Sequence, residues 1–371
     1  MPKVYWTTLI LSILLLFVGV YNYFTNKDIK ERRRKRRERT NYLNNISQQV
    51  KLEKIPINEG KLEGTICTVE DYKEYLKEIG LANNTGLKTQ WLISNYYLNL
   101  LKTDLKYAET TIMEYYKVVE GFEKMQKSLN RILFSDNYLF ADESLFQIGN
   151  IYFYELLDMQ KTFEIYQEFL KKYPLSEKEE DAKHKIYLIQ NNSDFNFVPL
   201  QQYAVAEKHE NEGIYEEAIK VLSESINNYP DCKLKDDILF KIGSVYQSKI
   251  KDYNKAILSY QRLIDEHKES DLLTKCYDFQ GVCYMALSQW EAAENCYEII
   301  LSISKDVHTT TRALFQTILC HENLGELEAA LNVIHQLKEY PKNVWTESAK
   351  MKEDEILEKI SSKNINWIDF K

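Results

Sequence analysis

Small and apolar residues recur along the second half of the chain with a period of 37 or 38 residues. The clearest copy spans residues 202–230, in which Ala206 and Ala218 lie twelve positions apart and Pro230 closes the copy. The position of Ala206 is occupied further along the chain by Gly243, Gly281 and Ile318. A fixed period of this length is typical of stacked repeats, and we predict two antiparallel helices in each copy.

Each residue type in this pattern has a physical role in such a helix pair. Small residues at the Ala206 and Ala218 positions let the two backbones approach closely where the helices cross. A proline ends the second helix, because it lacks an N–H group and clashes with the preceding turn. The larger side chains are expected to pack on the next pair, which covers the apolar face of its neighbour. The alanine position recurs at Ala256, Ala293 and Ala330, and the larger residues are His209, Tyr246, Tyr284 and His321, followed by Leu222, Tyr260, Tyr297 and Ile334.

This series of small, aromatic, alanine, aromatic and proline positions resembles the tetratricopeptide repeat (TPR) family. The segment Leu200–Pro230 matches the family's spacing best, and the segment from Phe146 to Pro174 fits with one inserted residue and with Thr162 in the alanine position. Tryptophan at the family's first position is absent from every copy, so the copies are divergent. The resemblance implies an all-α fold, a TPR-like α-solenoid of antiparallel helix pairs, with five repeats over residues 142–341.

The residues that flank and interrupt the repeats also have helical patterns. Between Pro174 and Leu200 the repeat spacing is stretched, and a predicted helix over 181–190 fits either a kink or an extra capping helix. A final part, 342–371, is predicted to form a capping helix over 345–360 and a tail that packs on it or docks elsewhere.

An N-terminal helical part is predicted over residues 66–141. Tyr96 and Ala108 have the spacing of the small and alanine positions, which indicates a degenerate repeat, although tyrosine fits the small position poorly. The helices that we predict there cover 68–79, 87–101 and 106–126.

The first residues, 1–26, are predicted to form a transmembrane anchor. The stretch from Val4 to Phe24 holds no charged residue over 21 positions, or roughly 31 Å of helix, enough to cross a hydrocarbon core. Tyrosine and tryptophan lie at both ends, where membrane interfaces favour them. A cleavable signal peptide is the alternative, but the positive charge follows the apolar run and no small-residue cleavage site is present.

A polybasic juxtamembrane helix is predicted over residues 27–53 after the apolar stretch, and a flexible tether, 54–65, follows this segment. Residues 1–40 carry ten basic and three acidic side chains, whereas the other 331 residues carry 38 and 53. Cations next to a span stay in the cytoplasm, so we predict the N-terminus outside and the repeats in the cytoplasm. The cluster either only sets this topology or also contacts anionic lipid, and nucleic acid is not an expected partner. Its members are Lys27, Lys30, Arg32, Arg33, Arg34, Lys35, Arg36, Arg37 and Arg39.

No pattern of a catalytic site, a cofactor site or a metal site stands out, so we predict a protein that is not an enzyme. The six cysteines include no C-x-x-C pair and are interpreted as small buried residues of a reducing compartment. His321 beside Cys320 raises the idea of a metal, but His321 occupies an aromatic position of the repeat, and packing explains it.

The resemblance implies a concave groove, lined by the first helix of each pair, that binds a peptide or a helix. Four of five repeats place an aromatic residue at the first groove position, with acids nearby, which indicates an apolar and partly basic peptide. Ordinary packing between repeats is the alternative for these aromatic residues. The set of lysine, asparagine and arginine residues with which chaperone-binding family members clamp a C-terminal carboxylate is missing. The predicted groove residues are Phe146, Asn150, Phe153, Tyr203, Glu207, Glu210, Phe240, Ser244, Gln247, Asp278, Val282, Met285, Phe315, Leu319 and Glu322.

Two functions remain open at this stage. The first is a membrane-anchored interaction scaffold that recruits a partner protein or peptide. The second is an assembly or quality-control factor for secreted or membrane proteins, with the repeats outside the cytoplasm, which the order of charges disfavours. Self-association of the array is compatible with either function.

Overall fold

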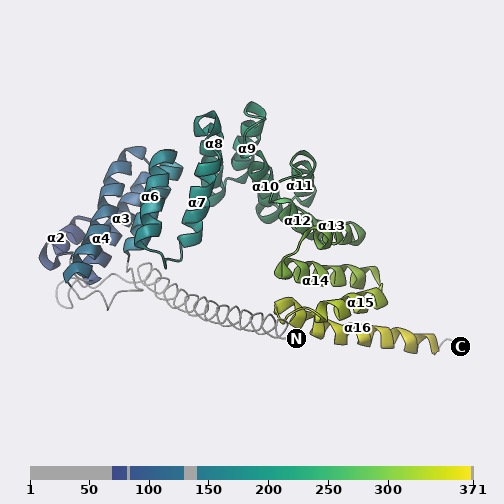
Figure 1. Ribbon diagram of the computed structural model, residues 1–371. Coiled ribbons are helices and arrows are strands. Elements are labelled where there is room, and N and C mark those ends of the chain that lie inside the picture. Colours follow the sequence, from purple (N-terminus) through teal and green to yellow (C-terminus); the bar gives the residue numbers. More distant parts are fainter. Residues whose placement is uncertain (1–68, 82–83, 129–139, 369–371) are drawn as a thin grey trace, which may run out of the picture. The chain divides into compact units, whose positions relative to one another are not determined.

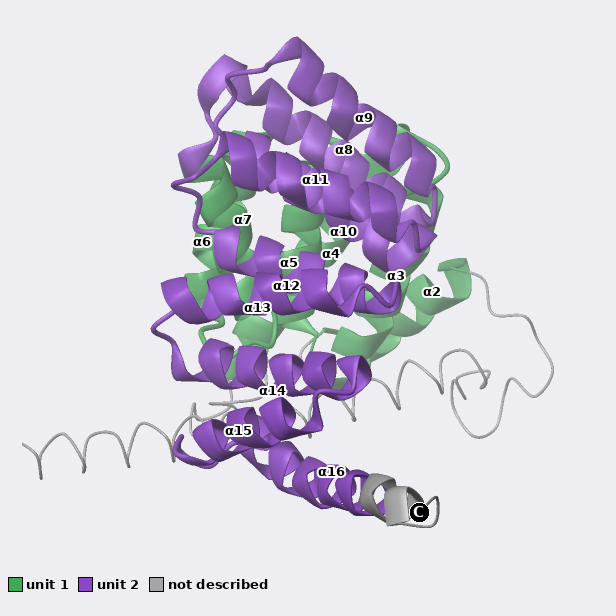
Figure 2. Ribbon diagram, turned by 90° about the vertical axis from the view of Figure 1, so that its right-hand side faces the viewer, with its two compact units in different colours: residues 1–190 green, residues 191–371 purple. Residues whose placement is uncertain are grey.

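The computed structural model describes residues 69–81, 84–128 and 140–368. The predicted anchor (1–26), polybasic segment (27–53) and tether (54–65) lie outside these ranges. No described helix offers an apolar stretch of the length that a bilayer requires. Every regular element in the described ranges is a helix, which agrees with the predicted all-α class (Figure 1). The chain divides at residue 190 into two units, 1–190 and 191–371, which Figure 2 shows in green and purple.

Unit 1 begins with three helices that the sequence predicted: α2 (Val69–Ile79), α3 (Asn84–Leu101) and α4 (Ala108–Ser128). Gly80 ends α2 in the left-handed conformation at φ 68°, which glycine adopts without a steric penalty. The prediction that Tyr96 takes the small position of a degenerate repeat is wrong, because its side chain is 44% exposed.

Helices α5 (Ala141–Asn150) and α6 (Met159–Lys172) form the repeat of unit 1, and a π-helical turn, Ile151–Glu155, extends α5. The stretched part of the array contains the predicted extra helix, α7 (Glu179–Asn191). Ala182 of α7 is fully buried in the same hydrophobic core as α5 and α6. Helix α7 therefore covers the repeat that precedes it.

Unit 2 stacks four helix pairs, and in each pair two consecutive helices pack on one another. The second helix of one pair also packs on the first helix of the next. The pairs are α8 (Val198–Glu212) with α9 (Tyr215–Asn228), α10 (Lys235–Val245) with α11 (Tyr253–Glu266), α12 (Leu273–Ala286) with α13 (Trp290–Ile303), and α14 (Val307–Leu324) with α15 (Leu327–Lys338). A second π-helical turn, Tyr246–Ile250, extends α10.

The helix crossings confirm why the repeat needs a small residue. A Cβ atom built on Gly243 would lie 2.5 Å from the ring of Tyr260, and one on Gly281 would lie 2.8 Å from the ring of Tyr297. Gly149 is covered in the same way by Tyr166, at 2.5 Å. These tyrosines are fully buried, so each ring packs on the glycine of its own pair. The expected contact with the next pair is found for Tyr260, whose ring centroid lies 6.1 Å from that of Phe279, but the packing on the glycine of the same pair was not expected.

A residue in the left-handed conformation joins the two helices of α5–α6 and of each of the four pairs of unit 2, five positions before the alanine position. Glycine takes this place in two pairs, at Gly213 and Gly325, both with φ 81°. The other pairs use Leu157 at 53°, Lys251 at 65° and Ser288 at 57°, where a side chain raises the conformational energy.

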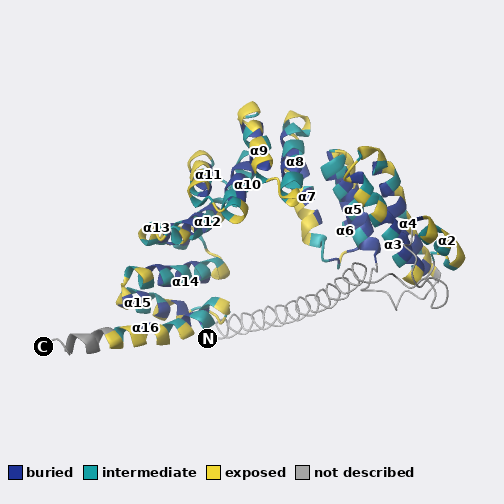
Figure 3. Cartoon of the chain, turned by 180° about the vertical axis from the view of Figure 1, so that it is seen from behind, coloured by how far each residue is buried: buried dark blue, intermediate teal, exposed yellow. Residues whose placement is uncertain are grey.

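Helix α16 (Val344–Ile368) closes unit 2 and packs on α14 and α15. Ala349 and Ile356 are fully buried against these helices, whereas exposed residues recur along α16 as far as Ser362 (Figure 3). The residues expected to form a separate tail continue this helix as far as Ile368, since neither proline nor glycine interrupts them.

Candidate functional site

All fifteen residues predicted for the groove lie on the first helices of the pairs or on the π-helical turns that extend them. We call this surface the first-helix face. Three of the residues belong to unit 1, and the other twelve belong to unit 2. The structure therefore brings together the members within each unit.

The aromatic residues predicted in unit 1 belong to its core. The Phe146 ring lies 5.4 Å from Tyr166 and 5.5 Å from Phe169, between ring centroids. Phe153 is fully buried, with the ammonium group of Lys185 4.1 Å from its ring centroid. Asn150 accepts a hydrogen bond of 2.8 Å from the hydroxyl of Tyr166. In unit 1 packing between helices, the alternative interpretation, describes these residues best.

The aromatic residues predicted in unit 2 lie between successive first helices. Phe240 of α10 and Phe279 of α12 are 5.3 Å apart between ring centroids, and Phe315 of α14 is 5.6 Å from Trp345 of α16. Phe240 and Phe315 are half-buried, whereas Tyr203 is only 6% exposed. Phe240 and Phe315 thus join neighbouring repeats and still present part of their surface to the first-helix face.

The acids predicted on this face form ion pairs with the following first helix. Lys241 of α10 lies 3.2 Å from Glu207 and 3.0 Å from Glu210, both on α8. Burial lowers the pKa of Lys241, but the two carboxylates raise it by more, so the net shift is upward. Lys249 also lies 3.8 Å from Glu210, so Glu207 and Glu210 are both paired with cations within the protein.

Two further acids are paired in the same direction along the stack. The carboxylate of Asp278 on α12 lies 2.5 Å from the guanidinium of Arg312 on α14. Burial raises the pKa of Asp278 even though Arg312 lowers it. Glu322 of α14 pairs with Lys352 at 2.8 Å and with Lys359 at 2.5 Å, both on α16.

Sequence reasoning missed the basic partners of these pairs. Lys241 and Arg312 lie on first helices and Lys352 lies on the closing helix α16, and they take different positions relative to the repeat. Whether they meet acids of the preceding repeat depends on how the pairs stack. The spacing of residues within one repeat does not predict such a contact.

The remaining predicted residues are uncharged, and none of their side chains is fully exposed. The hydroxyl of Tyr260 donates to Gln247 Oε1 at 2.8 Å, and that of Tyr297 donates to the Met285 sulfur at 3.4 Å. Val282 and Leu319 are half-buried, as is Ser244. With the acids neutralised, the first-helix face of unit 2 combines partly exposed apolar side chains with internally paired charges.

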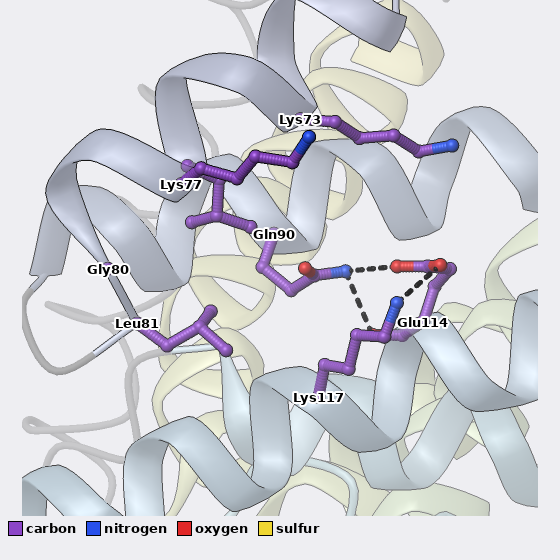
Figure 4. A pocket seen from close by; sticks show the side chains of 8 residues that line it. Lys73, Lys77, Gly80, Leu81, Gln90, Glu114 and Lys117 are labelled. Carbon is purple, nitrogen blue, oxygen red and sulfur yellow. Dashed lines mark hydrogen bonds and ion pairs between the residues drawn. The ribbon is translucent and has the colours of Figure 1, made fainter.

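Unit 1 contains a separate pocket of about 430 Å³ between α2, α3 and α4 (Figure 4). Four of its polar side chains, Lys73, Gln90, Glu114 and Lys117, are bonded to each other or to a nearby residue. Gln90 donates to the Glu114 carboxylate at 2.6 Å, and Lys117 pairs with the same carboxylate at 2.7 Å. Lys73 donates to Tyr97 at 2.7 Å, which is the main cause of the raised pKa of Lys73. The lining residues are Lys73, Leu76, Lys77, Gly80, Leu81, Gln90, Glu114 and Lys117.

The cysteines of the described ranges have the environment expected of packing residues. All five are buried and free. Burial raises the thiol pKa of Cys276, Cys283, Cys296 and Cys320 to about 12. A thiol at that pKa is protonated at neutral pH and is a poor nucleophile.

Two segments of the chain, 143–176 and 237–270, match the tetratricopeptide repeat family model. These segments cover the pairs α5–α6 and α10–α11, so TPR repeats are present in both units. No curated protein matches the chain.

Several solved structures are similar to the chain at low identity. MamA of AMB-1 is 12% identical over 53% of this chain and 96% of its own, with a TM-score of 0.34. PilW, described as a widely conserved type IV pilus biogenesis factor, is 13% identical over 69% of this chain and 97% of its own, with a TM-score of 0.35. Pseudomonas aeruginosa PilF is 13% identical over 71% of this chain and 99% of its own, with a TM-score of 0.33. Scores this low carry no information on function.

Proposed function

We propose that this chain of tetratricopeptide repeats is a non-enzymatic scaffold that holds a partner protein against the first-helix face of unit 2. One observation supports this function above the others. Apolar residues such as Phe240, Val282 and Leu319 stay partly exposed on this face, while the acids among them are neutralised by the next repeat. Such a surface suits a segment that buries apolar side chains.

The pairing of the acids changes the expected chemistry of the partner. A basic peptide would have to displace Lys241, Arg312 or Lys352 from carboxylates that already hold them at 2.5–3.2 Å. An apolar segment can bind without breaking these pairs. We therefore propose an apolar partner segment, and we no longer expect basic residues to dominate it.

Site-specific photo-crosslinking tests this surface. A photoreactive amino acid replaces Val282, which lies at the middle of unit 2 on the first helix α12. The matched control replaces Leu258, a residue of the second helix α11 that is 69% exposed. We expect a discrete crosslinked protein with position 282 in the cells of origin, and none with position 258. Equal crosslinking at both positions, or none at 282, would contradict the proposed surface.

We also propose that residues 4–24 fix the scaffold to a membrane, with the repeats in the cytoplasm. The support is the uncharged stretch of 21 residues and the nine cations that follow it. A protease site introduced at residues 61–65 tests the orientation in sealed membranes. We expect cleavage only from the cytoplasmic side. Cleavage only from the opposite side would favour an assembly factor that acts outside the cytoplasm.

A further inference from the structure

Three side chains of types that can bind a metal ion meet where α14 joins α15 in unit 2. They are Glu294 of α13, His321 near the end of α14, and Glu326, the N-cap residue of α15. One ligand atom from each residue lies within 4.8 Å of the other two. The imidazole Nδ1 of His321 is 2.8 Å from a Glu326 oxygen, and its Nε2 is 3.3 Å from a Glu294 oxygen.

The two carboxylates form no ion pair with lysine or arginine among the described residues, which distinguishes them from the acids of the first-helix face. Burial raises the pKa of Glu294, and His321 lowers it. The negative charges of Glu298, Glu326 and Glu291 then raise it again. The surroundings of Glu294 thus hold an excess of negative charge, and an imidazole is the nearest basic group.

Backbone hydrogen bonds position two of the three side chains. Gly325 takes the left-handed conformation, and the N–H of Glu326 donates to the carbonyl of His321 at 2.9 Å. This arrangement ends α14 and fixes the backbone of His321 relative to that of Glu326. The third residue is held by the packing of α13 on α14.

We propose that Glu294, His321 and Glu326 bind a divalent transition-metal ion of the zinc class. One imidazole nitrogen and carboxylate oxygens are ligands that Zn²⁺ accepts at roughly 2.0–2.2 Å. Rotations about the glutamate side-chain bonds bring the oxygens from separations of up to 4.8 Å to the roughly 3.3 Å that two ligands of one tetrahedral ion require. Glu326 is 54% exposed, so water can complete the coordination from that side.

Cys320 takes no part in this site, even though it precedes His321 in the sequence. Its side chain is fully buried in the core between α13 and α14, and its thiol has a pKa of about 12. The ion would instead join α13 to the turn between α14 and α15, and so link two repeats at the end of unit 2.

The chain contains an internal control for this site. His209 takes the same repeat position in α8, three residues after Ala206, as His321 does after Ile318. His209 Nδ1 lies 3.9 Å from Glu212, and no second carboxylate pairs with it among the described residues. A histidine at the same repeat position, with a single carboxylate neighbour, is therefore available for comparison.

Zinc titration of the purified full-length chain, in competition with a chromophoric chelator, tests the proposal. We expect one competing Zn²⁺ ion per chain in the parent and in the His209→Ala control. We expect His321→Ala and Glu294→Gln each to weaken this binding at least about tenfold. Glu294→Gln keeps the size of the side chain, and the melting curve checks that the variant remains folded.

Substitution with Co²⁺ provides a readout that does not depend on stability. We expect the parent and His209→Ala to show visible absorption bands of Co²⁺ bound to nitrogen and oxygen, and His321→Ala to lack them. The proposal is overturned if the parent fails to compete for Zn²⁺, or if folded His321→Ala and Glu294→Gln bind it as tightly as the parent.

Discussion

The pairs α8–α9 and α10–α11 solve the same packing problem with different residues. In α10–α11 the buried ring of Tyr260 lies on Gly243, where even a methyl group would come within 2.5 Å of it. In α8–α9 the equivalent residues are Ala206 and Leu222, both fully buried. Compared with α10–α11, the pair α8–α9 thus has a smaller side chain on its second helix (leucine in place of tyrosine) and a larger one on its first (alanine in place of glycine). The volume at the crossing is shared between the two helices, because a protein interior tolerates neither a void nor an overlap.

The two pairs also differ in length by one residue. The anchor and the alanine position are thirteen residues apart in α10–α11 and twelve apart in α8–α9. The pair α5–α6 has the longer spacing too, and both longer pairs contain a π-helical turn at the end of the first helix. A π turn absorbs one extra residue within the helix. The alanine position thus keeps its place relative to the helix crossing despite the inserted residue.

The longer pairs share a further contact that closes the repeat. The Ser270 hydroxyl after α11 donates to the Asp236 carboxylate at 2.6 Å, and the Ser176 hydroxyl after α6 donates to Asp142 at 2.7 Å. Each serine follows its aspartate by 34 residues and is the last residue of a segment that matches the family model. These two repeats are therefore alike in their crossing, their insertion and their closing hydrogen bond.

The largest effect is expected from exchanging the residues at the crossing. Gly243→Ala should destabilise unit 2 by about 2 kcal/mol, since the clash with the Tyr260 ring outweighs the higher helix propensity of alanine. Adding Tyr260→Leu, which recreates the Ala206–Leu222 combination, should recover part of this loss. Thermal melts of both single variants and of the double variant measure the coupling. Additive losses would contradict the idea of a shared volume.

A smaller effect is expected from a carboxyl group that α10–α11 has and α8–α9 lacks. Burial, assisted by the carboxylates of Asp236 and Asp271, raises the pKa of Asp237 to about 7, although Lys275 lowers it. Because this pKa lies above the ordinary value of 3.8, the folded state holds an extra proton between these values. The free energy of unfolding should thus fall as pH rises through this window and level off above pH 7.

Asp237→Asn should remove this dependence and stabilise the protein by about 1.5 kcal/mol at pH 8. Leu200 holds the equivalent position in α8–α9 and is fully buried without charge. Urea denaturation at several pH values provides the measurement, with the exposed Asp265→Asn of α11 as the control. Equal pH profiles for Asp237→Asn and the parent would show that folding does not raise the pKa of this carboxyl group.

The smallest effect is expected at the turn between the two helices. Lys251→Gly should stabilise α10–α11 by about 1 kcal/mol, because glycine adopts the left-handed conformation without the cost of a side chain. Gly213→Ala should destabilise α8–α9 by a similar amount, since its Cβ would meet no atom closer than 3.9 Å and only the conformation would be penalised. Melting temperatures that shift in the same direction for both variants would contradict this explanation.

The repeats were predictable because their signal is local. Gly149, Gly243 and Gly281 mark the crossings from the sequence alone, and the structure places a tyrosine ring on each. The inserted residue of the first repeat was visible too, but its conversion into a π turn was not. Spacing does not say whether a loop or a helix absorbs an extra residue.

The surface between repeats was harder to predict. Phe146 and Phe240 have the same repeat position, yet the first is core and the second is half-buried. The partners of Glu207 and Glu322 lie 34 and 30 residues further along the chain, so their pairing depends on stacking. Glu294 and His321 meet for the same reason, which is why the sequence led to packing rather than to a metal site at His321.

The buried cysteines of α12, α13 and α14 allow the local opening of these helices to be measured directly. Cys276 and Cys283 lie on α12, Cys296 on α13 and Cys320 on α14, all at most 5% exposed. A thiol-trapping reagent can reach them only when the surrounding helices separate. The rate at which each is trapped, resolved by mass spectrometry, would map which repeat opens first without any engineered cysteine.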